Sequence, residues 1–337
     1  MQALYQETTG GPEAVRIAEV PTPLPGPGEV RVAIRAASVN HREMWIARGL
    51  YPGMNLPITM GCDGAGVVDM LGAGVDEGVT GAAIGDEVVI YPGLDWGANR
   101  HAPQAAFGLL GMPHAGTIAQ YVCVPVASLA PKPAFMSFEE AAATVLTGLT
   151  AWRALMFKGQ LKAGETLLIS GVGGGVATFG LAFAVALGAK VYVTAESDEV
   201  LARAVEMGAL GGVLYTDPEW RKAIGKLTGG IDVVLDGAPA PSFANYVRAI
   251  NPGARIVIYG STAGDKFEIT ATGIFLKSAS IVGSQVGDQQ DFREMLAFVE
   301  HHRIKPVIER SFPLAEAREA LLYLENQHKF GKVVVTV

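Results

Sequence analysis

A glycine-rich loop is the feature of this sequence best suited to chemistry with phosphate. The loop covers residues 171–176 and reads Gly-Val-Gly-Gly-Gly-Val, between the apolar run Thr166–Ile169 and an apolar, helix-like segment. Glycine lets backbone N–H groups approach a pyrophosphate closely, and a helix N-terminus adds unpaired donors and partial positive charge. The loop therefore predicts a bound dinucleotide. Its predicted contacts are Gly171, Gly173, Gly174, Gly175 and Val176.

A glycine motif alone is a weak signal, because tight packing of a helix on a strand also needs glycine. Here the flanking elements favour the dinucleotide. A second strand is expected at 190–194 and a helix at 198–207, with Ser197 as its N-cap. Further strands at 212–215, 231–236 and 255–259 alternate with helical stretches. This alternation predicts an α/β fold with a doubly wound parallel sheet, which holds ligands at the carboxyl ends of its strands.

Composition favours a soluble cytoplasmic protein of two domains. The chain has 337 residues, of which 50% are hydrophobic and 18% charged, so extended disorder is not expected. The net charge of -7 argues against nucleic acid or an anionic membrane as the main partner. The most apolar helix, 179–187, is too short to span a membrane, and the strand-like N-terminus does not look like a signal peptide. Two cysteines, Cys62 and Cys123, predict no disulfide framework and a reducing compartment.

The residues before the nucleotide unit have a different character. Residues 1–130 contain short β-patterned runs with many glycines and prolines, which predicts a compact, mostly antiparallel β domain. The stretch 131–133, Pro-Lys-Pro, is interpreted as a linker to a helix at 137–157. After residue 286, helices are expected at 291–302 and 314–327, followed by a strand at 332–337. The expected domains are 1–130 with 287–337, and 131–286 for the nucleotide.

These motifs, taken in order along the chain, resemble the medium-chain dehydrogenase/reductase superfamily over nearly the whole length. Within it, the chain is similar to the zinc-free quinone oxidoreductase branch and to bacterial relatives often named zinc-type alcohol dehydrogenases. The resemblance implies a GroES-like catalytic domain interrupted by a Rossmann domain. The segments that carry it are 26–30, 38–43, 61–66, 85–88, 141–152, the glycine loop and 330–332.

The zinc positions of that superfamily decide which mechanism is expected. In zinc-dependent relatives the ligands match positions 40, 62 and 146, with an acid at 63, and this chain has Asn40, Cys62, Leu146 and Asp63 there. A catalytic zinc ion needs about three protein ligands from Cys, His, Asp or Glu. The lobe of the structural zinc matches residues 94–115, which contain no cysteine. We therefore expect no bound metal. His101 and His114 in this lobe are expected to be ordinary surface residues.

Without a metal, positioned hydrogen-bond donors must stabilise the charge that develops during hydride transfer. The resemblance to quinone oxidoreductases points to Asn40 and Tyr51 as pocket residues and places Thr150 beside the nicotinamide. Glu43 and Trp45 are larger than that branch's usual residues, which puts substrate shape in doubt. The alternatives are that Asn40 is structural, that Tyr51 covers the core and that Thr150 bonds its own helix backbone.

The choice of nicotinamide cofactor depends on the end of the second strand. NAD selection usually needs a carboxylate there to bind the ribose hydroxyls. NADP selection instead needs the carboxylate to be absent and a cation to lie nearby. Ala195 fills the acidic position and favours NADP(H), Glu196 opposes it, and Arg203 is the nearest cation. Tyr215 matches a position beside the adenosine phosphate, or it packs on the sheet. Further predicted cofactor contacts, from strand ends and from the resemblance, are Ser197, Gly237, Tyr259, Gly260, Ser261, Ser284 and Lys332.

Three classes of function remain open. The first is a zinc-independent NAD(P)H-dependent reductase of a quinone or an α,β-unsaturated carbonyl. The second is an alcohol dehydrogenase that recruits a metal through Cys62 and Asp63. The third is a non-enzymatic NADP(H)-binding sensor or structural protein. A strand within 276–286 should end the nucleotide sheet, and relatives pair this edge with a twofold mate, so a homodimer is expected.

Overall fold

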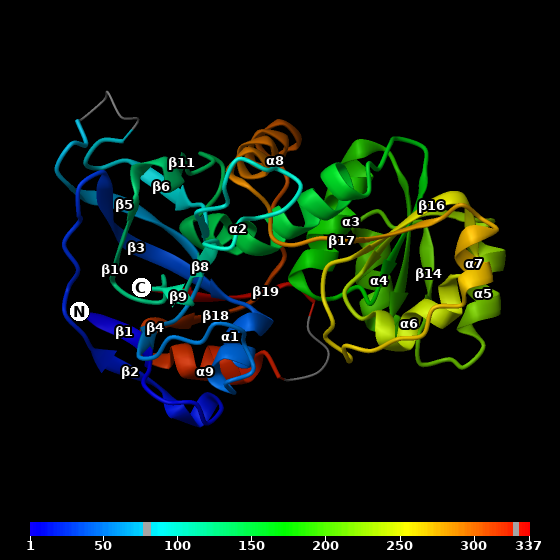
Figure 1. The fold of residues 1–337 in the computed structure, drawn as a ribbon, viewed down its shortest axis with the longest axis horizontal. Helices are drawn as coiled ribbons and strands as arrows, with labels where there is room; N and C mark the ends of the chain where they lie inside the picture. The colour runs from blue at the N-terminus through cyan, green and yellow to red at the C-terminus, as the bar shows by residue number, and fades with distance from the viewer. Residues whose placement is uncertain (77–81, 326–329) are drawn as a thin grey trace. The chain divides into compact units, whose positions relative to one another are not determined.

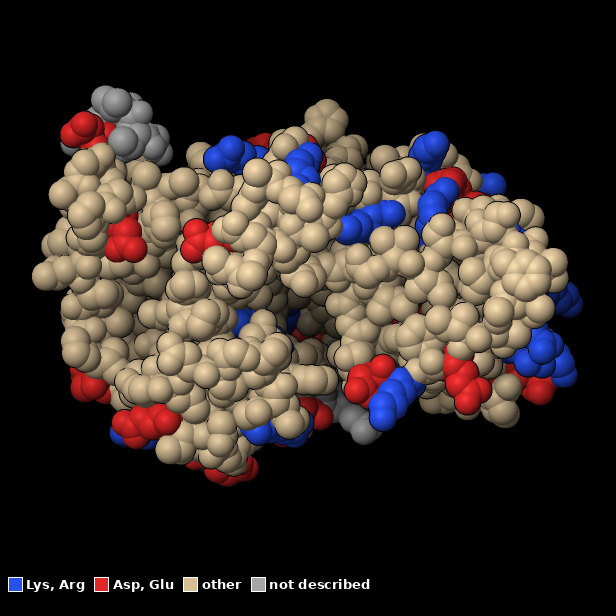
Figure 2. All heavy atoms as spheres, in the orientation of Figure 1, with Lys and Arg blue, Asp and Glu red and all other residues tan. Residues whose placement is uncertain are grey.

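The computed structural model describes residues 1–76, 82–325 and 330–337, which divide into two compact units (Figure 1). The first unit contains the described residues of 1–146, 288–327 and 332–337, and the second contains those of 147–287 and 328–331. Within the described residues, no helix has the length and apolarity needed to cross a membrane. On the face drawn in Figure 2, cationic and anionic side chains are interspersed over a larger uncharged surface.

The second unit is built on a parallel sheet with the strand order β14-β13-β12-β15-β16-β17. This is the order of a doubly wound dinucleotide-binding fold, in which the first strand lies at the centre. The strands are β12 (Thr166–Ser170), β13 (Lys190–Ala195), β14 (Gly211–Leu214), β15 (Ile231–Asp236), β16 (Ile250–Ile258) and β17 (Ser280–Gly283).

Successive residues of a strand point to opposite faces of the sheet, and the central strands are buried at nearly every position. Helices therefore cover both faces of this sheet. On one face, Leu168 and Val234 join a core with Trp220 and Phe243, which come from α5 and α6. On the other face, α3 packs so closely that a Cβ added to Gly180 would lie 2.6 Å from Leu235. The helices are α3 (Gly175–Leu187), α4 (Asp198–Glu206), α5 (Trp220–Thr228), α6 (Pro239–Tyr246) and α7 (Ala271–Phe275).

The first unit is a mostly antiparallel β structure. Its large sheet has the order β11-β6-β5-β3-β19-β18, and β10 also pairs with β3. β18 and β19 of this sheet pair in parallel, whereas β3 pairs antiparallel with β5, β10 and β19. Two smaller sheets have the orders β2-β1-β4 and β7-β8-β9. The strands are β1 (Gln2–Gln6), β2 (Val15–Glu19), β3 (Glu29–Val39), β4 (Ile58–Thr59), β5 (Asp63–Leu71), β6 (Glu87–Ile90), β7 (Gly93–Leu94), β8 (Gly108–Leu110), β9 (Pro113–His114), β10 (Tyr121–Pro125), β11 (Leu129–Pro131), β18 (Ile308–Pro313) and β19 (Lys332–Thr336).

Helices of the first unit pack on this β structure. α1 and α9 contribute to a core with residues of β3, β18 and β19, such as Ile46, Leu321 and Val335. The α-helices are α1 (His41–Ala47), α8 (Gln289–His302) and α9 (Ala317–Tyr323), and α2 (Phe138–Trp152) begins in the first unit and ends in the second. Short 3₁₀ turns form at Pro12–Ala14, Val126–Ser128 and Leu314–Glu316, and a π-type turn at Arg153–Lys158 follows α2.

The expected linker at 131–133 is not a linker. Pro131 ends β11, which pairs with β6, and Lys132 forms an ion pair with Glu87 at 3.1 Å. The first unit therefore extends to residue 146, beyond the expected boundary at 130. The helix expected at 314–327 is a 3₁₀ turn followed by α9, which ends at Tyr323; residues 326–327 lie outside the described residues.

Candidate active site

Asn40 follows the long strand β3 and is the N-cap of helix α1 (His41–Ala47), which fixes its backbone. The backbone N–H of Asn40 donates to Glu43 Oε2 at 2.7 Å, and the N–H of Glu43 donates to the Asn40 carbonyl at 3.0 Å. An acidic side chain at the third helical position commonly satisfies the N-cap in this way. Glu43, larger than the residue that the resemblance led us to expect, is therefore a capping residue, and its side chain is fully buried.

The side chain of Asn40 belongs to a buried polar cluster around Asp63, which we call the Asp63 cluster. Asp63 Oδ2 accepts from Ser38 Oγ at 2.5 Å, from Asn40 Nδ2 at 2.9 Å and from Lys332 Nζ at 3.1 Å. Its other oxygen, Oδ1, accepts from the backbone N–H of Leu146 at 2.7 Å. Asp63 is 0% exposed and Lys332 3% exposed, so the ion pair lies inside the unit, where its hydrogen bonds offset the cost of desolvation.

Lys332 is the cation of this cluster. Its ammonium group donates to Asp63, to Asn40 Oδ1 and, at 3.3 Å, to the carbonyl of Val39. An ammonium group has three N–H donors, and these contacts use all of them. A contact to the cofactor, as predicted for Lys332, would have to replace one of them.

A second charged pair lies beside Asn40. Arg42 Nη1 donates to Glu43 Oε1 at 3.1 Å and to the carbonyl of Leu110 at 2.9 Å, and its guanidinium carbon lies 4.8 Å from the ring centroid of Tyr51. Burial raises the pKa of the Glu43 carboxyl, although the charge of Arg42 opposes this shift. Burial also raises the pKa of the Cys62 thiol well above its ordinary value, and the carboxylates of Glu43 and Asp63 add to this effect. Cys62 is therefore a neutral thiol.

These residues do not fit a catalytic zinc ion. Zinc needs thiolate, imidazole or carboxylate ligands, and a carboxylate offers about four acceptor positions. In the described structure, four donors contact Asp63, three at Oδ2 and one at Oδ1, and Leu146 contributes only its backbone N–H. Cys62 is neutral and accepts a weak contact from Asn40 Nδ2 at 3.5 Å. Among the described residues there is also no cluster of three or more His, Cys, Asp or Glu side chains able to hold a metal.

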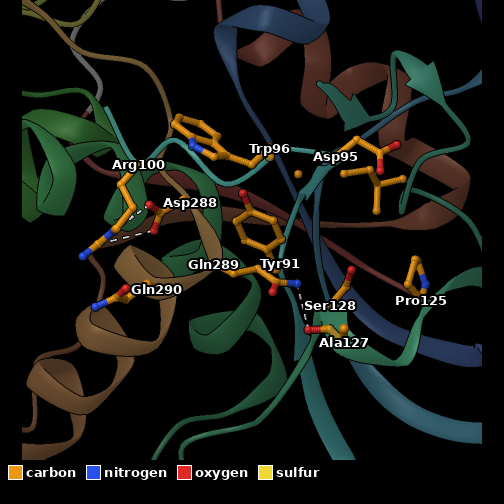
Figure 3. A pocket seen from close by; sticks show the side chains of 13 residues that line it. Tyr91, Asp95, Trp96, Arg100, Pro125, Ala127, Ser128, Asp288, Gln289 and Gln290 are labelled. Atoms are coloured by element: carbon orange, nitrogen blue, oxygen red, sulfur yellow. Dashed lines mark hydrogen bonds and ion pairs between the residues drawn. The ribbon is translucent and has the colours of Figure 1, made fainter. Parts of the chain in front are cut away.

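The lobe at 94–115, which contains no cysteine, is held by ion pairs and ring contacts. Arg100 Nε donates to Asp288 and Nη2 to Asp291, both at 2.9 Å, which ties the lobe to the first turn of α8. Trp96 meets Phe107 edge to face with ring centroids 5.0 Å apart. A cavity of about 440 Å³ opens beside these residues, and Figure 3 shows Trp96 and Tyr91 on its wall with the Arg100–Asp288 pair at its rim.

The predicted phosphate loop lies between β12 and α3, as its sequence implies. Gly171 has φ +71°, which favours glycine, whereas Gly174 is the N-cap of α3 with an ordinary φ of −73°. A Cβ added to Gly174 would meet no atom within 4 Å. Packing of α3 on the sheet therefore leaves little room for a side chain at Gly180 but does not restrict Gly174. The open space above Gly174 is what close approach of a ligand to the helix N-terminus needs.

Strand register brings most of the other predicted cofactor residues to one edge of the sheet. Ser170 pairs with Asp236, Asp236 with Ile258, and Ile258 with Gly283. The residues that follow these strand ends therefore lie at the same edge, because all the strands are parallel. They are Gly171, Gly237, Tyr259, Gly260, Ser261 and Ser284.

A buried carboxylate shapes this edge. Asp236 accepts from the Ala238 N–H at 2.8 Å, from Ser242 Oγ at 2.6 Å and from Tyr246 Oη at 2.8 Å. Burial raises its pKa, and these hydrogen bonds oppose the shift. The Tyr259 ring packs so tightly that a Cβ on Gly237 would lie 2.6 Å from it. Gly237 is thus required by packing, in addition to its predicted contact with the cofactor.

At the end of β13, the predicted ribose residues are neighbours. Ala195 pairs with Leu214 in the sheet, which brings Glu196 beside Tyr215, and the Tyr215 hydroxyl donates to Glu196 Oε2 at 3.5 Å. Ser197 caps α4 by accepting from the Val200 N–H at 3.3 Å.

Arg203, the cation considered for NADP, interacts with Phe330. Its guanidinium carbon lies 4.5 Å from the centre of the Phe330 ring, and its Nη2 donates to the Phe330 carbonyl at 3.4 Å. A contact with a 2′-phosphate would compete with this arrangement.

Sequence reasoning missed the partners that complete the Asp63 cluster. Ser38 was seen only as part of a motif, and Lys332 was assigned to the cofactor. The signal for the ion pair was present, because Lys332 begins the apolar strand 332–337 and Asp63 lies in the apolar run 61–68. A charge placed in a strand of this kind requires a buried partner. Thr150 lies in α2 and is buried, and its predicted role beside the nicotinamide stays a prediction.

Comparison with known proteins gives the family. A family model described as "Alcohol dehydrogenase GroES-like domain" matches residues 26–134, and one described as "Zinc-binding dehydrogenase" matches residues 175–301. "Zinc-type alcohol dehydrogenase-like protein YogA" of Leptosphaeria maculans is 36% identical over 335 residues, covering 94% of this chain and 93% of that protein. The chain belongs to the medium-chain dehydrogenase/reductase superfamily. It is an oxidoreductase of this NAD(P)-dependent type, and the predicted GroES-like and Rossmann architecture is confirmed.

Other members of the superfamily that resemble the chain bear different names. A crystal structure of an "NAD-dependent alcohol dehydrogenase" is 40% identical, with a TM-score of 0.94 and 100% of both chains covered. "Quinone oxidoreductase" of Pseudomonas aeruginosa is 28% identical, covering 97% of this chain and 96% of that protein. "Acryloyl-coenzyme A reductase" of Metallosphaera sedula is 27% identical, covering 97% and 98%.

Proposed function

We propose that the protein is a zinc-independent NAD(P)H-dependent reductase of a quinone or an α,β-unsaturated carbonyl compound. The observation that carries this proposal is the Asp63 cluster. Where zinc-dependent relatives are expected to hold a metal, hydrogen-bond donors surround the Asp63 carboxylate, and the lysine ammonium of Lys332 neutralises it. The site offers amide and hydroxyl groups, which suit a reaction that needs donors rather than a Lewis acid.

The bound nicotinamide cofactor would supply a hydride to the substrate. Hydride addition at the β-carbon of an enone moves an electron pair onto the carbonyl oxygen, which becomes an enolate, and a proton from solvent then completes the reduction. Asn40 is assigned to donate an N–H to that oxygen, and Tyr51 is assigned to line the pocket. One preorganised donor of this kind typically contributes about 10²- to 10³-fold in turnover. Relatives named quinone oxidoreductase and acryloyl-coenzyme A reductase support this substrate class.

A second candidate is an alcohol dehydrogenase with an atypical metal site at Cys62 and Asp63. Relatives named alcohol dehydrogenase favour it. The present arrangement opposes metal binding, because a metal would have to displace donors from Asp63 and ionise the Cys62 thiol, whose pKa is raised. The third candidate, a nucleotide-binding sensor or structural protein, predicts cofactor binding without turnover.

One screen separates these candidates. Cofactor oxidation is followed with NADH and NADPH against a panel of enones, quinones and aldehydes, before and after chelation, together with elemental analysis. Chelation-resistant reduction of an enone or quinone is the expected result. Stoichiometric zinc with activity confined to alcohols or aldehydes would establish the second candidate, and tight cofactor binding with no turnover would establish the third.

We infer a preference for NADP(H) from Ala195, which leaves the end of β13 without a carboxylate. Glu196, placed beside Tyr215, is the group that opposes it. The ratio of kcat/KM for NADPH to that for NADH tests the preference, and Glu196→Gln should raise this ratio if the carboxylate repels a 2′-phosphate.

We also propose a homodimer formed through β17, and a cytoplasmic location. β17 ends the nucleotide sheet, and nearby Phe275 and Leu276 are 63% and 74% exposed. An open strand edge beside apolar side chains favours pairing with another chain. The location rests on the two free cysteines, which suit a reducing compartment.

A further inference from the structure

We propose that Lys332 is a positioning residue for the reaction, which holds the side-chain amide of Asn40 in one orientation. The inference rests on the proposed function for its catalytic consequence, but the orientation itself comes from the contacts. Lys332 Nζ, Asn40 and Asp63 form a closed triangle: the ammonium donates to Asn40 Oδ1 and to Asp63 Oδ2, and Asn40 Nδ2 donates to the same Asp63 oxygen.

A lysine ammonium can only donate, so it selects the oxygen end of the amide. With Oδ1 held by Lys332, the NH₂ group of Asn40 must face Asp63 and Cys62. One N–H then makes a charge-assisted bond of 2.9 Å to Asp63, and the other donates to the Cys62 sulfur at 3.5 Å, its one acceptor among the residues that the structure describes. Sulfur is a weak acceptor, so this second N–H is the one that a substrate oxygen can take over.

If Lys332 were absent, Asp63 would still accept from the NH₂ group, but no donor would hold Oδ1. The amide could then turn, and its N–H would no longer be fixed toward the place where the enolate oxygen develops. The burial of the cluster strengthens this selection, because Asn40 is 7% exposed and Lys332 3% exposed and water cannot compete freely for either end of the amide. This role differs from the predicted cofactor contact, since the ammonium already uses its three donors within the cluster. The two roles give opposite kinetic signatures.

The test compares Lys332→Met, which keeps most of the side-chain length, with Lys332→Arg, which keeps the charge. We expect Lys332→Met to lower kcat about 10- to 100-fold, with KM and Kd for NADPH changed less than about twofold, and Lys332→Arg to restore part of the loss. A large rise in Kd for NADPH with normal kcat at saturation would overturn the proposal in favour of a direct cofactor contact.

Lys132→Met is the matched control. The side chain of Lys132 is also little exposed, at 6%, and also forms an ion pair at 3.1 Å, here with the exposed Glu87, but it does not contact the Asp63 cluster. It should lower the melting temperature without changing kcat. The double variant Lys332→Met/Asp63→Asn removes both buried charges and should recover thermal stability but not turnover, because nothing then fixes the Asn40 amide.

A readout without turnover separates this proposal from the proposed function. In protein labelled with ¹⁵N-asparagine, the side-chain NH₂ signals of Asn40, assigned by their loss in Asn40→Asp, should shift in Lys332→Met and stay in place in Lys132→Met. Unchanged Asn40 signals in Lys332→Met would overturn the positioning role. A shift of these signals in a protein inactive on every enone and quinone would reject the proposed function and retain the positioning of the amide.

Discussion

Replacing Gly174 with valine tests the phosphate loop with little disturbance of the fold. Gly174 has φ −73° and ψ 162°, a conformation that valine adopts without strain. A Cβ at this position has no neighbour within 4 Å. The remaining structural cost is that valine is a poorer N-cap than glycine for α3, about 1 kcal/mol. We therefore expect the variant to remain folded at 25 °C.

The same substitution should weaken cofactor binding far more than it destabilises the fold. The valine methyl groups would stand at the N-terminus of α3, where the pyrophosphate is expected to accept backbone N–H bonds. Losing two hydrogen bonds to a charged group costs about 3 to 6 kcal/mol, taking 1.5 to 3 for each. At 1.4 kcal/mol per factor of ten, the dissociation constant for NAD(P)H should rise roughly 100- to 10,000-fold.

Calorimetric titration with NADPH and NADH, paired with thermal melts, measures both quantities. Gly225→Val is the matched control, because it makes the same change in α5, where a Cβ would lie 3.6 Å from Ala249 in ordinary contact. The control should bind cofactor normally. Unchanged affinity in Gly174→Val would refute the placement of the pyrophosphate, and a loss of the fold in that variant would show that Gly174 serves packing instead.

Four further outcomes are expected. Asn40→Ala should lower turnover roughly 10- to 1000-fold with cofactor affinity unchanged; normal turnover with a melting temperature lowered by the unsatisfied Asp63 cluster would instead make Asn40 structural. The purified protein should carry substoichiometric zinc and should fold and bind cofactor after chelation. Unfolding by a chelator would contradict the expectation that the protein needs no bound metal. Light scattering at micromolar concentration should give a dimer, and a monomer would remove the β17 interface. Burial raises the pKa of Cys123 to about 11, so its alkylation at pH 8 should be about 100-fold slower than that of a thiol with the ordinary value, and rapid labelling would contradict its environment.

The nucleotide unit could be predicted closely from sequence because its signals are local. Buried parallel strands are continuous apolar runs that end at glycine or a polar residue, so the strand at 231–236 was placed at its exact bounds. The start of β16 was missed, since its first residues, Ile250 to Gly253, include a proline and a glycine that suggest a turn. Register then brought the predicted loop residues to one edge without further information.

The first unit was harder because its pairings are long-range. β3 pairs with β5, β10 and β19, and no local pattern identifies β19, which lies almost 300 residues later, as its neighbour. The same applies to the site. Asn40 and Asp63 could be found by their positions in a motif, but the hydrogen bonds that join them to Ser38 and Lys332 depend on how three strands align.

The sequence separation within the Asp63 cluster has a consequence for biosynthesis. Lys332 follows Asp63 by 269 residues, so at 5 to 20 residues per second a ribosome needs about 13 to 54 s to deliver the cation after the anion. Throughout that interval the interior of the first unit lacks both the counter-charge of Asp63 and the strand that fills the gap beside β3. The sheet of the second unit lies within the contiguous stretch 147–287 and can form while translation continues. We therefore expect the second unit to fold before the first unit during synthesis. The N-terminal β segments must then avoid aggregation until β19 leaves the ribosome.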